Sequence, residues 1–149
     1  MQKVKVTGEV HICLKGPDGR IRDEEIVRNL VVTTGRQHIA DQMADQGAAA
    51  MSHMSIGTGT TAADATDTAL ETELDRNALT SKTQGSGTDA NKVTYVGDWA
   101  AGDGTGAITE AGIFNSASAG DMLCRSVFAV KNKAAGDTPV SYTHLTLPT

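Results

Sequence analysis

A glycine-rich stretch, SIGTGTTAADATDTAL from Ser55 to Leu70, contains the residues of this chain best suited to a chemical role. Gly57, Gly59 and Ala62 have the spacing G-x-G-x-x-A, and they follow a strand-like segment, MSHMSI. In a dinucleotide site such glycines approach the pyrophosphate, and a later carboxylate binds the ribose. The acidic residues downstream here are Glu71, Glu73 and Asp75. The question is whether this loop binds a nucleotide or only turns the chain.

The sequence around the loop argues against nucleotide binding. A dinucleotide site needs a buried parallel strand and an immediate helix whose N-terminus faces the pyrophosphate. Here the preceding strand alternates polar and apolar residues from Met51 to Ile56, and too little chain follows for a doubly wound sheet. No lysine follows the glycines, as a Walker-type loop requires. Because Gly-x-Gly in a β-rich chain is usually a turn or bulge, we expect no cofactor.

The other reactive residues predict no catalytic or metal site, so the chain is not expected to be an enzyme. There is no G-x-S-x-G elbow and no C-x-x-C, and no two histidines are paired at i, i+2 or i, i+4. A cluster of carboxylates lacks the spacing of a calcium loop and is interpreted as a solvated acidic face or a helix start. These carboxylates are Asp64, Asp67, Glu71, Glu73 and Asp75.

Two aromatic residues and two cysteines leave alternatives open. Tyr95 and Trp99 would lie on one face of a continuous strand, where they could form a sugar-binding platform or fill the core. Cys13 and Cys124 lie far apart in sequence, and two unpaired thiols are favoured over a single disulfide in a reducing compartment. Alternation places Cys13, with His11, on the polar face of its strand.

Composition limits the class of protein. A chain of 149 residues is the size of one domain, and with 3% aromatic residues it predicts a thin core that neighbouring subunits would help to cover. The formal net charge is −5, and no basic stripe interleaved with aromatics suggests a nucleic-acid partner. No apolar run reaches the length of a membrane span, and the first residues, MQKVKVTGEV, lack the apolar centre of a signal peptide. We expect synthesis in a cytoplasm.

Hydrophobic periodicity predicts a β-rich domain with one helix. In KVKVTGEVHICLKG the even positions are apolar, the turn GPDG follows, and IRDEEIVRNLVV completes a hairpin. The apolar positions are Val4, Val6, Val10, Ile12 and Leu14. Next, TTGRQHIADQMADQG predicts a short amphipathic helix near residues 35–46. Thr33 or Thr34 would cap this helix and Gly47 would end it. Its expected apolar stripe is Ile39, Ala40, Met43 and Ala44.

After the helix, short strand candidates alternate with glycine-rich turns. These candidates are AAAMSHMSIG, NALTSKTQG, KVTYVGDWA, GAITEAGIF and MLCRSVFAVKN. Strands at such spacing predict a mainly β fold, an antiparallel β-sandwich of immunoglobulin-like or jelly-roll-like type, and not a βαβ alternation.

The last ten residues, VSYTHLTLPT, differ in origin from the rest. Read back as GTC TCT TAT ACA CAT CTG ACG CTG CCG ACG, they resemble a translated sequencing adapter at all ten positions. We therefore interpret residues 1–139 as one structural domain and 140–149 as an adapter-derived tail. The hairpin GIFNSASAGDMLCRSVFAV would then have lost its proper neighbour and expose a strand edge. The tail could still pair as a strand, since Tyr142, Leu145 and Leu147 suit one, although Pro148 cannot donate to a ladder.

Three motifs in order resemble a family of small bacteriophage structural proteins, described as tail-fibre or tail-collar-like. They are NLVVTTGRQHIADQM, then MSIGTGTTAADATDTALETEL followed by Arg76, then ITEAGIFNSASAGDMLCRSVFAV. Relatives carry a strand "IGTGTTAP", a "TAL..E" segment with an arginine soon after, and a strand pair like "ITEAGIFN…LCRTVF". The resemblance spans about residues 8 to 139. Asp64 stands near where many relatives have proline, and the tail replaces the family's final strand.

The resemblance implies a non-enzymatic virion component, in the tail fibre or tail tip, that serves host attachment. Such proteins pack as oligomers, often trimers, against copies of themselves and other virion proteins, and a host-surface glycan is a further expected partner. In this interpretation Gly57 and Gly59 turn the chain at a sheet edge, and Leu70 and Leu74 fix a surface crossover. The final hairpin would supply Ile113, Phe114, Leu123, Val127 and Phe128 to the core. The alternatives are a capsid decoration or head-fibre protein, a carbohydrate-binding module that needs exposed Trp99 and Tyr95, and a hydrolase acting on surface glycans.

Overall fold

The computed structural model describes residues 5–146, with residues 140–145 described by their backbone only. Val4, Leu147 and Pro148, which figured in the sequence predictions, lie outside the described residues. The strands are β1 (Thr7–Lys15), β2 (Ile21–Val31), β3 (His53–Gly57), β4 (Glu73–Ala78), β5 (Ser81–Gln84), β6 (Lys92–Asp98), β7 (Gly106–Phe114), β8 (Met122–Lys133) and β9 (Thr138–Thr146). The helices are α1 (Thr33–Met43) and a short 3₁₀ turn, η1 (Gly87–Asp89).

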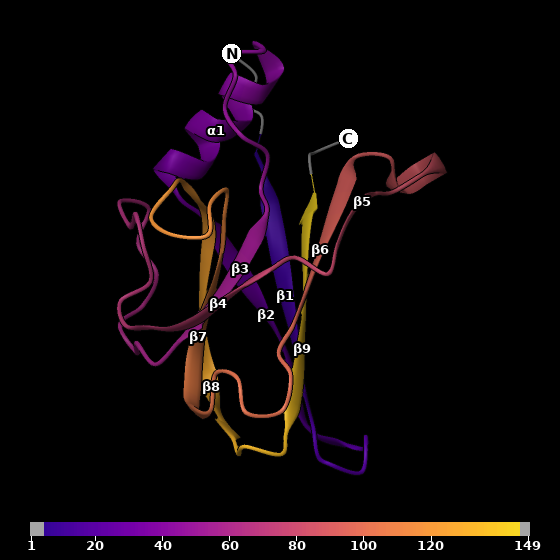
Figure 1. Ribbon diagram of the computed structural model, residues 1–149. Helices are drawn as coiled ribbons and strands as arrows, with labels where there is room; N and C mark the ends of the chain where they lie inside the picture. Colours follow the sequence, from indigo (N-terminus) through magenta and orange to yellow (C-terminus); the bar gives the residue numbers. More distant parts are fainter. Residues whose placement is uncertain (1–4, 147–149) are drawn as a thin grey trace.

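The strands form one antiparallel sheet that curls into two facing layers (Figure 1). Its order in the described residues is β4-β3-β7-β8-β2-β1-β9-β6-β5. Strand β2 belongs to both layers: it pairs with β1 along most of its length, and at Leu30 and Val31 it pairs with β8. This confirms the mainly β antiparallel sandwich with one short helix. The finer choice between immunoglobulin-like and jelly-roll-like topology stays a prediction.

The sheet is closed by two consecutive residues between its end strands. Strands β4 and β5 are neighbours in sequence but lie at opposite ends of the sheet. The N–H of Leu79 donates to the carbonyl of Ser52 beside β3, at 2.8 Å, and the N–H of Thr80 donates to Val96 on β6, at 2.8 Å. Successive backbone N–H groups therefore bond the two layers, which holds the edges of the sandwich together.

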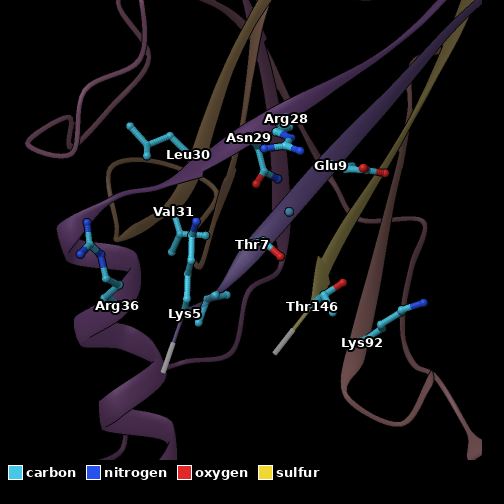
Figure 2. Close-up of a pocket in the computed structure, with 12 residues that line it drawn as sticks. Lys5, Thr7, Glu9, Arg28, Asn29, Leu30, Val31, Arg36, Lys92 and Thr146 are labelled. Atoms are coloured by element: carbon cyan, nitrogen blue, oxygen red, sulfur yellow. The ribbon is translucent and has the colours of Figure 1, made fainter. Parts of the chain in front are cut away.

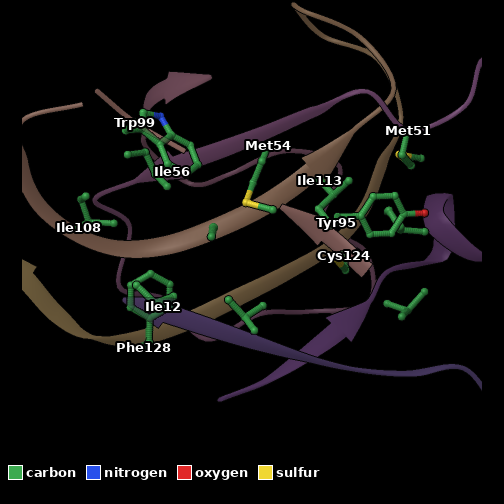
Figure 3. Close-up of a cluster of buried hydrophobic side chains, with 14 residues drawn as sticks. Ile12, Met51, Met54, Ile56, Tyr95, Trp99, Ile108, Ile113, Cys124 and Phe128 are labelled. Atoms are coloured by element: carbon green, nitrogen blue, oxygen red, sulfur yellow. The ribbon is translucent and has the colours of Figure 1, made fainter. Parts of the chain in front are cut away.

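The core lies between the two layers and contains Tyr95, Trp99 and Phe128 (Figure 3). Trp99 is 1% exposed and Tyr95 is 8% exposed, and they lie at opposite ends of the cluster. Of the two roles considered for Tyr95 and Trp99, the structure supports core filling: both rings are buried and neither forms a sugar-binding platform on the surface. From the final hairpin, Ile113, Phe114 and Leu123 are buried as predicted. The same holds for Phe128, and Val127 is half-buried.

Helix α1 begins earlier and packs on another face than the sequence predicted. Val32 is its N-cap residue, and the Thr34 hydroxyl donates to the Met122 carbonyl at 2.9 Å instead of capping the helix. The buried positions are Gly35 and His38. The predicted stripe is wrong at Ala40, Met43 and Ala44, which are exposed, whereas Ile39 is half-buried and packs against the core as predicted. The cause is Gly35, whose Cα lies so close to the Leu123 carbonyl that a Cβ would clash. The helix ends at Met43, and Gly47, with φ of 83°, lies in the turn that follows.

The C-terminal strand β9 completes the layer opposite the final hairpin. It pairs with β1 from Thr7 to Lys15 and with β6 from Lys92 to Asp98. The hairpin β7–β8 has β3 beside β7, but β2 pairs with β8 only at Cys124 and Arg125. In the described residues the rest of β8 has no second ladder partner, so the expected exposed edge of this hairpin stays a prediction. The edges that depend on residues 138–146 belong to β1 and β6. Whether these residues derive from an adapter stays a prediction.

The prediction that Cys13 lies on a solvated face is also wrong. Cys13 is 5% exposed, because its short side chain lies in the middle of a layer beside the cross-strand residue Glu24. His11 on the same face is half-buried, with its Nε2 3.2 Å from the Glu24 carboxylate. Cys13 and Cys124 are both free and buried.

Candidate functional site

The glycine-rich loop lies over two buried charges from the neighbouring strands. It runs from the end of β3 to the start of β4, and β7 and β8 pass beneath it. Gly112 on β7 is directly opposite Arg125 on β8, which makes Glu110 and Arg125 diagonal neighbours on one face of the sheet. Glu110 is fully buried and Arg125 is 2% exposed. Charged groups this deeply buried must be paired and hydrogen-bonded to be tolerated.

The Glu110 carboxylate binds the backbone of the loop. Its Oε1 accepts hydrogen bonds from the N–H groups of Gly59, at 2.9 Å, and Thr72, at 2.8 Å. Its Oε2 accepts from the N–H of Glu71, at 3.0 Å, and from the Arg125 Nε, at 2.9 Å. The Thr109 hydroxyl also donates to the Gly59 carbonyl at 2.7 Å. Both ends of the loop are thus bound to one carboxylate.

The two glycines are needed for this close approach. A Cβ on Gly57 would lie 2.5 Å from Glu110 Oε1, and a Cβ on Gly59 would lie 2.6 Å from the same atom. Converging backbone N–H groups of this kind are what phosphate loops offer to an anion. In this chain an internal carboxylate already occupies that place. The loop therefore has no free anion position at its glycines.

Arg125 connects the carboxylate to the outer part of the loop. Its Nη1 donates to Asp67 at 2.9 Å, and its Nη2 donates to the Thr61 carbonyl at 3.0 Å. Burial disfavours the charged guanidinium, but hydrogen bonds to Glu110 and Asp67 outweigh burial and raise the pKa of Arg125. The guanidinium stays charged and fixes the loop from below.

The acidic residues of the loop mostly hold the loop itself together. Glu71 accepts from the N–H and hydroxyl of Thr61, at 2.8 and 2.9 Å, and these bonds lower the pKa of Glu71. The Asp64 carboxylate accepts from the N–H and hydroxyl of Thr66, which lowers the pKa of Asp64. Asp64 and Glu71 are exposed, as a solvated acidic face predicts, whereas Asp67 is half-buried against Arg125. The alternative of a helix start is wrong, because no helix lies between β3 and β4. Among the residues whose side chains the structure describes, no group of three or more histidine, cysteine or acidic side chains could hold a metal ion.

Arg76 fixes the turn between β7 and β8. Its guanidinium carbon lies 3.7 Å from the centroid of the Phe114 ring, a cation–π contact. Its Nη1 donates to the carbonyls of Ser116, at 3.0 Å, and Ala119, at 2.8 Å. A salt bridge of 2.6 Å joins it to Glu73. The arginine thus ties the start of β4 to the tip of the final hairpin.

The predicted leucine anchors differ from one another. Leu70 is 7% exposed and packs with Val32, Phe114 and Met122 in a small apolar cluster under the loop. Leu74 is 39% exposed, so it does not anchor the crossover as expected.

The glycine spacing predicted the loop, but Glu110 and Arg125, the residues that fix it, were not predicted. The available signal was a single charge inside each of two otherwise apolar strands, GAITEAGIF and MLCRSVFAV.

No protein-family model, no curated protein and no solved structure matches this chain. Among the described residues, neither helix has the length and apolar character needed to cross a membrane.

Proposed function

We propose that this chain is a non-enzymatic structural protein of a bacteriophage particle. Its place is the tail fibre or tail tip, where it serves host attachment as an oligomer packed against copies of itself and other virion proteins. The observation that carries the proposal is the Glu110 carboxylate. It fills the anion position of the loop that most resembles a cofactor site.

The residues that carry the family resemblance are also the residues of this network. The segment IGTGTTA supplies the N–H of Gly59, and the segment TALE supplies the N–H of Glu71. The arginine that follows is Arg76, which holds the turn of the final hairpin. The strand pair ITEAGIF and LCRSVF supplies Glu110 and Arg125. Motifs far apart in sequence therefore serve one structural purpose, which favours a scaffold over a catalyst.

Two alternatives from other classes have less support. A carbohydrate-binding module would need Trp99 and Tyr95 on the surface, whereas both residues are buried. A glycoside hydrolase needs two free carboxylates facing one cleft, whereas Glu110 is already bound by Arg125 and the loop backbone. A capsid decoration or head-fibre protein is compatible with the same architecture, and the experiment below separates it from a tail protein.

The test is to locate the protein on particles. The gene is recovered with its neighbours, phage carrying it are propagated, and antibodies raised against the purified chain are applied in immunogold electron microscopy. Gold at the tail tip or fibres, with tail and baseplate genes alongside, is the expected result. Gold on the head contradicts the tail assignment in favour of capsid decoration. Particles that carry no label at all overturn the virion proposal.

A further inference from the structure

A groove with a volume of about 850 Å³ lies where β1, β2, β6 and β9 meet the start of α1 (Figure 2). This volume is within the range of pockets that enclose small ligands. Among the described residues, the charged side chains along it are Lys5, Glu9, Arg28, Arg36 and Lys92. Four of these five are cations, in a chain whose formal net charge is −5. The groove therefore concentrates positive charge on an acidic protein.

Three of the four cations of the groove also differ from most others in lacking partners. Elsewhere in the chain, Arg22, Arg125 and Lys131 each form a close ion pair with a carboxylate. Within the described residues, Lys5, Arg28 and Arg36 form no hydrogen bond or ion pair through their side chains, a property shared only with Lys15 among lysines and arginines. Three of the four unpaired cations thus line one groove.

Lys92 completes the basic wall from the side of β6. It is itself paired with Asp89 at 2.6 Å, so it contributes less to the field of the groove than the unpaired cations. Figure 2 shows Arg28 and Arg36, from β2 and α1, around the same opening as Lys5. Two guanidinium groups with free N–H donors match the oxygens of a phosphate, which they bind in bidentate fashion.

The remaining lining chemistry favours hydroxyl groups beside the phosphate. Glu9 is directly opposite Arg28 in the register of β1 and β2, and its carboxylate can accept hydrogen bonds from hydroxyls. The Thr7 hydroxyl lies on the same strand. Among the lining residues whose side chains the structure describes, none is an aromatic on which a base would stack, and Glu9 repels a continuous phosphate backbone. A sugar phosphate fits these features better than a nucleic acid.

We propose that this groove binds a phosphate-bearing polysaccharide through Lys5, Arg28 and Arg36, with Glu9 and Thr7 contacting sugar hydroxyls. The inference deepens the attachment role proposed above and rests on it for the source of the ligand, a host-surface polymer. The binding chemistry itself depends only on the groove.

The test is calorimetric titration of the full chain with phosphorylated mannan, with unphosphorylated mannan, inorganic phosphate and a short single-stranded oligonucleotide as comparisons. Saturable binding of phosphorylated mannan alone, weakened by added salt, is expected. The double variant Arg28→Gln/Arg36→Gln should bind at least about tenfold more weakly, because charge-assisted hydrogen bonds are lost. Lys15→Gln removes an unpaired cation outside the groove and should bind like the wild type. Amide shifts of Thr7, Glu9 and Arg28 in the wild-type NMR spectrum locate the site without any variant.

Each other outcome contradicts the proposal. No binding of phosphorylated mannan, or shifts outside the groove, overturns the site. Equal binding of inorganic phosphate or of the oligonucleotide overturns the polysaccharide assignment, and equal loss in Lys15→Gln means that only net charge matters. Because the assay uses the purified chain, a negative result leaves the labelling of particles unaffected, so the two proposals fail separately.

Discussion

Glu110 on β7 and Arg125 on β8 are diagonal cross-strand neighbours whose carboxylate and guanidinium meet at 2.9 Å beneath the glycine-rich loop. Both are buried, and every other hydrogen bond of their side chains goes to the loop. Through this pair, β7 and β8 hold the glycine-rich loop in place. Removal of the pair is therefore the most direct test of the architecture.

Replacing Glu110 with glutamine should destabilise the protein by roughly 3 kcal/mol, because the buried Arg125 guanidinium loses its fully buried charged partner. Urea unfolding of the wild type and Glu110→Gln measures this difference. Hydrogen exchange at the amides of Gly59, Glu71 and Thr72 should accelerate in the variant. The control Glu9→Gln removes an exposed strand carboxylate and should change stability little. Equal stability of Glu110→Gln and wild type would show that the pair does not support the loop.

Alanine at Gly57 or Gly59 should impair folding or assembly, while added nucleotide changes nothing. The reason is space: a Cβ at either position lies 2.5 to 2.6 Å from Glu110 Oε1. Thermal melts of both variants, compared with the exposed loop variant Thr60→Ala, measure the cost. Saturable binding of ATP or NAD in calorimetry, abolished by these substitutions, would contradict a purely architectural loop.

Acid should weaken the attachment of β2 to the turn before β9. The Ala134 N–H bonds to Asp137 and, with Arg22 acting in the same direction against burial, holds the pKa of that carboxyl below its ordinary 3.8. A lowered folded-state pKa stabilises the protein above the ordinary value, and this stability is lost as pH falls through the folded-state value.

The variant Asp137→Asn should be less stable than wild type at neutral pH and should approach it as the pH falls below about 4. Thermal melts over this range measure the convergence, with exposed Asp103→Asn as the control. A constant difference between Asp137→Asn and wild type at all pH values would rule out this ionisation as the cause.

Both cysteines should resist alkylation in the folded protein. Burial raises the pKa of the Cys124 thiol to about 12 and also raises the pKa of Cys13. Little of the reactive thiolate therefore exists at mildly alkaline pH. Mass spectrometry after iodoacetamide treatment should find two labels only when the protein is first unfolded without reductant. Absence of labelling in the unfolded, unreduced protein would reveal a disulfide and contradict the prediction.

Deleting residues 140–149 should cause the chain to self-associate. The deletion removes most of β9 and exposes the backbone edges of β1 and β6. If the segment is adapter-derived, a chain that carries the ending of the intact gene should be more stable than the present one. Sedimentation and thermal melts of the three proteins test both statements. Equal melting temperatures for the present and restored chains would mean that the present tail is a competent strand.

The sequence predicts what depends on local patterns. The β1–β2 hairpin was found because apolar residues alternate along the first strand and GPDG turns the chain after it. The Glu110–Arg125 network was not found, because it joins segments about fifty residues apart, which periodicity does not relate. The buried face of α1 was missed because it depends on the close contact of Gly35 with β8. The burial of Cys13 depends on both neighbouring strands, β2 and β9. The strands that pair with β9 could not be predicted either, because local sequence periodicity does not determine which strands become neighbours.

The pairing of β1 with β9 has a mechanical consequence. Thr7, at the start of β1, lies opposite Thr146, at the end of β9, so both segments leave the domain at the same end. Tension applied through these two segments would break the hydrogen bonds of the β1–β9 ladder one after another. It would not load all of these bonds at the same time, as a shearing force along the strands does. Such a domain resists pulling weakly through its ends. In a fibre under load, force would have to enter through its lateral surfaces.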